Sequence, residues 1–110
     1  MYMYKPKQLV ILTTCPDTET AKMIAGALVD KQLAACVQIG QVVESVYRWN
    51  NDICQSQEVP LQIKCMAEQY KAIEQLVIQM HPYEVPEFIA MPITNGFGPY
   101  LQWIEDNSLS

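Results

Sequence analysis

The chain has 110 residues, a length typical of a single domain with one hydrophobic core, here taken as residues 1–110. Hydrophobic residues make up 50% and charged residues 17%, which excludes a disordered chain and indicates that part of the surface contacts another subunit. Seven basic against twelve acidic residues give a formal net charge of −5, and the basic residues form no cluster. Because nucleic acids and anionic membranes bind clustered cations, neither is expected as a partner.

The amino-terminal third predicts a strand followed by a helix. Residues 8–14 are largely aliphatic and β-branched, as in a strand buried on both faces. Pro16 ends this strand, and Asp17 is suited to cap a helix that is expected to run to about Gln32. The apolar residues of this helix recur at the spacing of one helical face: Ala21, Ile24, Ala25 and Leu28.

The middle of the chain predicts a long hairpin. Two β-rich stretches, 34–39 and 42–49, are separated by Gly40, which marks a bend or a bulge. Asn50 and Asn51 tolerate positive φ, so they predict a tight turn into a return strand over residues 53–66. Pro60 within this return strand favours an edge position or a bulge.

The last third predicts a helix over 68–80, a strand over 88–94 and a short apolar helix beginning near Pro99. Pro92 favours an edge position for that strand. The order β-α-β-β-α-β with a terminal helix predicts an α+β, ferredoxin-like fold, in which two helices cover one face of an antiparallel sheet. The other face has no helix except the short last one, so we expect it to pack against further copies of the chain.

The sequence also predicts the compartment. No apolar run approaches the length of a membrane span, and the polar start of the chain lacks the apolar stretch of a signal peptide. We therefore expect a cytoplasmic protein whose four cysteines are mostly reduced.

A segment with two prolines, residues 81–87, gathers several groups that can bind ligands. It holds one imidazole, one phenol and two carboxylates: His81, Tyr83, Glu84 and Glu87. One interpretation is a loop that presents nitrogen and oxygen ligands to a metal ion or a small solute. The other is a rigid connector in which His81 caps the preceding helix.

A second group lies on the predicted hairpin. Ser45, Tyr47 and Trp49 recur at period two, so they share one face of a strand, and Glu58 and Lys64 lie on the strand that pairs with it. This pattern is typical of an aromatic-lined cleft with a few polar groups. It is also typical of a cross-strand ladder or of a subunit contact rich in Tyr and Trp, and the composition favours the subunit contact.

Cys15 closes the first strand beside the amino terminus of a helix, where the pKa of a thiol can be lowered and the sulfur can bind a soft metal. The alternative is a partly buried thiol with no role. No nucleophile–base pair and no phosphate-binding glycine loop is visible, so neither an enzyme nor an organic cofactor is expected.

Several stretches together resemble the CutA family of divalent-cation tolerance proteins. The resemblance implies a ferredoxin-like subunit in a compact homotrimer, similar in architecture to the signal-transducing PII proteins. It also implies a role in tolerance of divalent metals, copper above all. The matching stretches are Lys31-Gln32-Leu33-Ala34-Ala35-Cys36-Val37, Ser45-Val46-Tyr47-Arg48-Trp49, Glu58 with Leu61 and Lys64, His81-Pro82-Tyr83-Glu84-Val85-Pro86-Glu87, and Tyr100-Leu101-Gln102-Trp103-Ile104.

The family's proposed copper site carries over only in part. It uses a cysteine in the first strand and a pair of histidines before the Pro-Tyr dipeptide, and these positions hold Thr13, Met80 and His81 here. Cys15 lies two residues after Thr13, on the same side of an extended strand, and could replace the missing thiol. The expected metal ligands, for copper or another divalent cation, are therefore His81, Cys15 and Glu84.

The resemblance leaves a second hypothesis of a different class. In it, the protein is a PII-like sensor or scaffold that holds a small metabolite or a protein partner in clefts between subunits. The residues expected to line those clefts are Tyr47, Trp49, Glu58, Lys64, Tyr83, Glu84 and Glu87.

Overall fold

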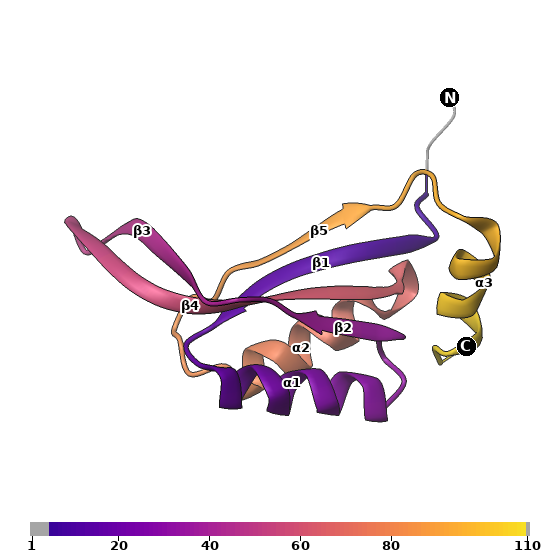
Figure 1. The fold of residues 1–110 in the computed structure, drawn as a ribbon, viewed down its shortest axis with the longest axis horizontal. Helices are drawn as coiled ribbons and strands as arrows, with labels where there is room; N and C mark the ends of the chain where they lie inside the picture. Colours follow the sequence, from indigo (N-terminus) through magenta and orange to yellow (C-terminus); the bar gives the residue numbers. More distant parts are fainter. Residues whose placement is uncertain (1–4, 110) are drawn as a thin grey trace.

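The computed structural model describes residues 5–109 and has the predicted order of elements (Figure 1). Its fold class, a ferredoxin-like α+β arrangement with a carboxy-terminal helix, is confirmed. The elements are β1 (Gln8–Cys15), α1 (Thr18–Asp30), β2 (Cys36–Ile39), β3 (Val43–Trp49), β4 (Asp52–Met66), the short 3-10 helix η1 (Ala67–Gln69), α2 (Tyr70–Met80), β5 (Phe88–Pro92) and α3 (Gly98–Asp106).

Helix α1 begins and ends for local reasons. The side chain of Asp17 accepts a hydrogen bond from the backbone N–H of Thr20 at 2.7 Å, which confirms the predicted cap. The helix ends at Asp30, two residues before the expected position, because Gln32 adopts a left-handed backbone conformation with φ of 58°.

The four paired strands of the main sheet lie in the order β2-β4-β1-β5, and all pairs are antiparallel. Strand β3 pairs with the first half of β4, and the two extend beyond the sheet as a hairpin (Figure 1). The predicted two-residue turn is present, since Trp49 pairs with Asp52 and both Asn50 and Asn51 have positive φ.

Of the two expectations for Pro60, the position in an edge strand is wrong. Strand β4 is interior to the sheet, between β1 and β2, whereas a proline favours an edge. Pro60 is accommodated because it lies between the part of β4 that pairs with β3 and the part that pairs with β2. Gly40 stands opposite this point, donating its N–H to the Pro60 carbonyl at 2.9 Å, and an added Cβ would lie 2.9 Å from the proline ring.

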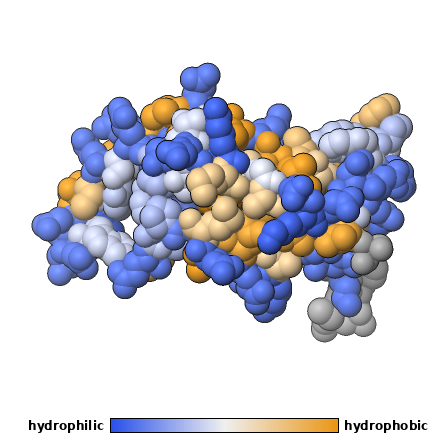
Figure 2. Space-filling model, turned by 90° about the horizontal axis from the view of Figure 1, so that it is seen from below, coloured by the Kyte–Doolittle hydropathy of each residue, from blue (hydrophilic) through white to orange (hydrophobic). Residues whose placement is uncertain are grey.

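The core lies between the sheet and the layer formed by α1 and α2 (Figure 1). The space-filling view onto the helix layer shows apolar residues among hydrophilic ones (Figure 2). Helices α1 and α2 have exposed apolar residues, namely Met23, Val29 and Ile78. The fully buried side chains that fill the core include Ile11, Ile24, Leu28, Leu61, Ile63, Cys65, Ile73 and Val77.

Helix α3 packs at the end of the sheet opposite the hairpin, instead of lying over the open face (Figure 1). Ile104 is fully buried there against Ala35 and Met66. The open face therefore keeps apolar side chains in contact with solvent, with Ile89 and Met91 of β5 52% and 46% exposed. Within residues 5–109, no helix is long and apolar enough to cross a membrane.

Candidate functional site

A cleft of about 800 Å³ lies at the base of the β3–β4 hairpin. Three parts of the chain form it: the end of β1, the hairpin, and the loop between α2 and β5. Its size is in the range of pockets that hold small molecules. The residues lining it are Thr14, Ser45, Val46, Tyr47, Trp49, Glu58, Tyr83, Glu84, Val85, Pro86 and Glu87.

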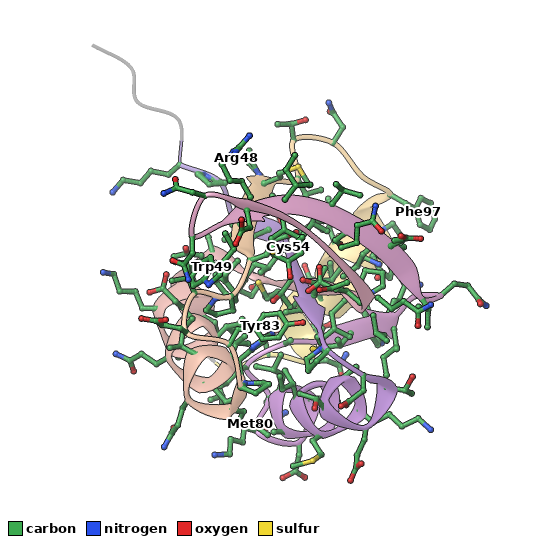
Figure 3. The ribbon with its side chains drawn as sticks, turned by 90° about the vertical axis from the view of Figure 1, so that its left-hand side faces the viewer. Arg48, Trp49, Cys54, Met80, Tyr83 and Phe97 are labelled. Atoms are coloured by element: carbon green, nitrogen blue, oxygen red, sulfur yellow. The ribbon has the colours of Figure 1, made fainter. Side chains whose placement is uncertain are left out.

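Two aromatic side chains of β3 contribute to the wall of this cleft. Tyr47 and Trp49 are each 42% exposed, and the Tyr47 hydroxyl shares a 2.7 Å hydrogen bond with the Ser56 hydroxyl across the hairpin. Arg48, between them in sequence, projects from the other side of the hairpin, away from Tyr83 (Figure 3). The alternation of the strand therefore keeps the aromatic rings in the cleft and the guanidinium out of it.

Glu58 is a buried carboxylate in the wall of the cleft. Its side chain is 7% exposed, and the Thr14 hydroxyl donates a hydrogen bond of 3.3 Å to Oε2. Between residues 5 and 109, the one ion pair found joins Lys7 to Glu105, so no lysine or arginine in this range neutralises Glu58. Glu58 thus lines the cleft without a basic side chain paired to it in the described residues.

Tyr83 comes from the loop and lies near the middle of the site (Figure 3). Burial raises the pKa of its phenol, and the neighbouring Glu58 carboxylate and Tyr47 phenol raise the pKa further. The phenol is therefore a neutral hydrogen-bond donor at ordinary pH.

His81 connects the loop to the end of β1. One ring nitrogen, Nε2, lies 2.6 Å from the carbonyl oxygen of Thr14, and the backbone N–H of Tyr83 donates to Nδ1 at 3.1 Å. A carbonyl accepts and an amide N–H donates, so this pairing requires a neutral ring with its proton on Nε2. The expectation that His81 caps the preceding helix is wrong, because its ring binds a carbonyl of β1 and the backbone N–H of Tyr83.

Cys15 is fully buried. Burial raises the pKa of its thiol to about 11, and the negative charges of Asp17 and Glu58 act in the same direction. The expectation that the helix amino terminus lowers this pKa is wrong, because loss of solvent outweighs the helix dipole.

The other positions of the family's copper site are also engaged. The Thr13 hydroxyl donates a 2.6 Å hydrogen bond to the carbonyl oxygen of Glu87, which attaches the loop to β1. Met80 packs against the hydrophobic core and lies among the helices below Tyr83 (Figure 3). Glu84 is exposed on the loop.

As arranged, these residues do not fit a resident metal ion. Among the described residues, no group of three or more His, Cys, Asp or Glu side chains converges closely enough to hold one. The two nitrogens of His81 already have partners, and the Cys15 sulfur carries its proton.

The structure gathers most of the predicted cleft residues and separates one of them. Lys64 lies further along β4, where its ammonium donates to the side chain of Gln38, and it does not line the cleft. Thr14 was missed from the sequence, since its role depends on β1 ending beside Glu58.

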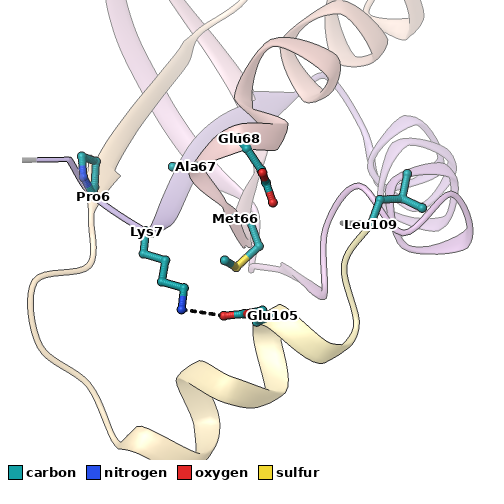
Figure 4. Close-up of a pocket in the computed structure, with 7 residues that line it drawn as sticks. All are labelled: Pro6, Lys7, Met66, Ala67, Glu68, Glu105 and Leu109. Atoms are coloured by element: carbon teal, nitrogen blue, oxygen red, sulfur yellow. Dashed lines mark ion pairs between the residues drawn. The ribbon is translucent and has the colours of Figure 1, made fainter.

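A smaller cavity of about 290 Å³ lies beside α3 at the other end of the molecule (Figure 4). Lys7 and Glu105 form an ion pair of 2.8 Å across it. The Glu105 carboxylate raises the pKa of Lys7. None of the residues predicted for a functional site lines this cavity.

Comparison with known proteins agrees with the fold and places the chain in a family. Residues 9–107 match the family model described as CutA1 divalent ion tolerance protein. The chain is 40% identical over 99 residues to the divalent-cation tolerance protein CutA of Thermus thermophilus, covering 90% of this chain and 96% of that protein. It is 44% identical over 91 residues to the human protein CutA. This match covers 83% of this chain and 51% of the human protein.

Solved structures give the same result. The crystal structure of the stable protein CutA1 from the psychrotrophic bacterium Shewanella sp. SIB1 is similar with a TM-score of 0.95 and 73% identity, covering 97% of this chain and 100% of that one. The Thermus thermophilus protein has a TM-score of 0.90 at 40% identity, with 92% and 98% covered. The molecule is thus a ferredoxin-like α+β protein with a cleft beside a protruding hairpin. It belongs to the CutA1 divalent ion tolerance family.

Proposed function

We propose that the protein is a homotrimeric, non-enzymatic protein of the cytoplasm that acts in tolerance of divalent cations, with copper as the main cation. The observation that carries this proposal is the family match over residues 9–107. The Thermus thermophilus relative, which is similar along almost its whole length, is named for divalent-cation tolerance.

The open face of the sheet supports self-association. The register of β1 against β5 places Val10 with Met91 and Leu12 with Ile89 on the face that no helix covers. Such a row of exposed apolar side chains is typical of a surface buried between subunits. Sedimentation equilibrium at micromolar concentration tests the trimer, and a mass of one subunit would contradict it.

The cysteines support a reducing compartment. All four are free thiols, although Cys36 and Cys54 are only partly buried. Extracellular domains of this size commonly depend on disulfides, which cytoplasmic ones lack. Cell fractionation of the tagged protein tests the cytoplasmic location.

Copper binding at His81, Cys15 and Glu84 requires a local rearrangement. The ring of His81 would have to release the Thr14 carbonyl, and the Cys15 thiol would have to lose its proton. A Cys15 thiolate is a soft ligand that suits Cu(I), and its formation releases a proton. We therefore expect any copper affinity at this site to increase with pH.

Calorimetric titration of copper at controlled redox state tests this site. The comparison is between the unmodified chain, His81→Ala and the exposed variant Glu84→Gln. Loss of one site per subunit in His81→Ala, with partial weakening in Glu84→Gln, supports the metal site. Equal binding by all three proteins would place the bound copper elsewhere.

A second candidate function is favoured by the cleft itself. In it, the protein is a PII-like sensor or scaffold whose cleft holds a small metabolite against Tyr47, Trp49, Glu58 and Tyr83. The cleft volume and its convergent aromatic and polar groups favour this candidate. Lys64 lies on the open face of the sheet, so it would take part only where copies of the chain meet. Ligand binding by Trp49→Leu and by Lys64→Met tests the candidate. We expect Trp49→Leu to lose binding because Trp49 lines the cleft, and a loss in Lys64→Met as well would place the ligand where copies of the chain meet.

A further inference from the structure

We propose that the cleft beside the hairpin recognises a small organic cation, namely a protonated or quaternary amine. This inference rests on the second candidate function and names the chemical class of its ligand. Three properties of the cleft point to this class: its aromatic walls, its unbalanced negative charge and the spacing of its carboxylates.

The aromatic walls provide faces for a cation. Tyr47 and Trp49 project from β3, and Tyr83 reaches the same cleft from the loop, so rings come from two separate parts of the chain. The rings of Tyr83 and His81 lie 4.7 Å apart between centroids, which fixes the position of the phenol. Aromatic faces attract ammonium groups through the negative potential above the ring, and tryptophan does so most strongly.

The charge of the lining has one sign. Glu58, Glu84 and Glu87 line the cleft, and no lysine, arginine or histidine does. Arg48 points away from the cleft, and Lys64 is engaged with Gln38 further along β4. Glu58 matters most, because it is 7% exposed and its hydrogen bonds come from the neutral hydroxyls of Thr14 and Tyr83, not from a basic side chain. A buried carboxylate without a counter-charge is stabilised by a bound cation.

The spacing of these carboxylates favours an organic cation over a bare metal ion. A calcium ion needs six or more oxygen atoms within about 2.6 Å, and a zinc ion needs about four ligands. In the described residues, no three acidic, histidine or cysteine side chains converge in this way. An alkylammonium ion spreads its charge over several carbon atoms, so separate carboxylates and rings can contact it at the same time.

The test compares a cation with an uncharged molecule of the same shape. Choline and 3,3-dimethyl-1-butanol differ by the replacement of the quaternary nitrogen with carbon, and each is titrated calorimetrically into the assembled protein. We expect choline to bind at least about tenfold more tightly than the alcohol. Tetramethylammonium and arginine methyl ester serve as further cationic probes.

Two variants locate the binding. Glu58→Gln keeps the shape of the buried side chain without its charge, and we expect it to weaken choline binding about tenfold. Trp49→Leu removes a 42% exposed ring that lines the cleft, whereas Trp103→Leu removes a 43% exposed ring on α3 and serves as its control. We expect weaker binding in Trp49→Leu alone. Thermal unfolding of each variant verifies the fold, and Trp49→Leu decides the question if Glu58→Gln is unstable.

The outcomes separate failure of this inference from failure of the second candidate function, on which it rests. Equal binding of choline and the alcohol, lost in Trp49→Leu, would overturn cation recognition while the ligand-binding cleft remained. Absence of binding by all three cations up to about 10 mM would overturn the inference. Retained binding in Trp49→Leu and Glu58→Gln would overturn it as well, by placing the cation elsewhere. The copper titration with His81→Ala decides the metal function independently.

Discussion

At the end of the sheet where α3 packs, the contact is made by apolar side chains, with Ile104 buried against Ala35 and Met66. At the hairpin end, the contacts are instead hydrogen bonds between buried polar groups, those of His81, Thr14 and Glu58. Apolar contacts contribute stability in proportion to the area that they bury, whereas buried polar groups must first recover the cost of losing water. The first end therefore stabilises the fold, and the second holds polar groups in fixed positions beside the cleft.

The largest effect is expected where the apolar end is cut back. Ile104→Ala removes a fully buried side chain and should lower the free energy of unfolding by about 2–4 kcal/mol, through lost burial and the cavity left behind. Ile53→Ala, on the hairpin at 71% exposure, is the control and should change stability by less than about 0.5 kcal/mol. Urea unfolding of both variants checks this, and equal losses would contradict the contrast.

A smaller loss is expected at the polar end. His81→Ala leaves the Thr14 carbonyl and the Tyr83 N–H without their partners and should cost about 1–3 kcal/mol. Glu84→Gln, in the same loop but exposed, is the matched control with little expected change. Thermal unfolding measures both. An unchanged stability of His81→Ala would show that the imidazole does not position the loop.

The buried thiols predict a pH dependence. Burial raises the pKa of Cys15 to about 11 and that of Cys65 to about 12, from an ordinary value of 9.0. Because the folded state favours the protonated thiols, their contribution is fully present below pH 9 and is lost as pH rises toward 11–12. Unfolding measured from pH 8 to pH 11 should show falling stability. In Cys15→Ala the slope should be shallower, and an unchanged slope would contradict the assignment.

The smallest effect is expected at the exposed ion pair. Lys7→Met removes the partner of Glu105 beside the smaller cavity (Figure 4). Exposed ion pairs contribute little because water and salt screen them. We expect a slight drop in unfolding temperature that disappears at high salt. A large drop independent of salt would show that the pair fixes α3.

Local sequence patterns predicted most of the fold. The cap at Asp17, the turn at Asn50 and Asn51 and the element order each depend on neighbouring residues, and each is present. The aromatic period on β3 also predicted the side of the hairpin that lines the cleft.

The remaining features depend on contacts between distant segments. The interior position of Pro60 follows from β4 changing partner, which no local pattern reveals. The raised pKa of Cys15 and the two hydrogen bonds of His81 arise where β1, α1 and the loop meet. Lys64 was assigned to the cleft because it lies on the strand that pairs with the aromatic strand β3, but that ladder ends at Glu58 and Lys64 pairs with β2 instead.

The change of partner along β4 also has a consequence for engineering the molecule. One strand serves two neighbours, β3 over its first half and β2 over its second, and the exposed residues 40–42 join those neighbours. Gly40 is fixed against Pro60, but each ladder keeps its own register with β4. Additional residues placed between Gln41 and Val42 would lengthen the connection without shifting either ladder. This junction is accordingly the position in the sheet best suited to carry an inserted peptide or fluorescent tag.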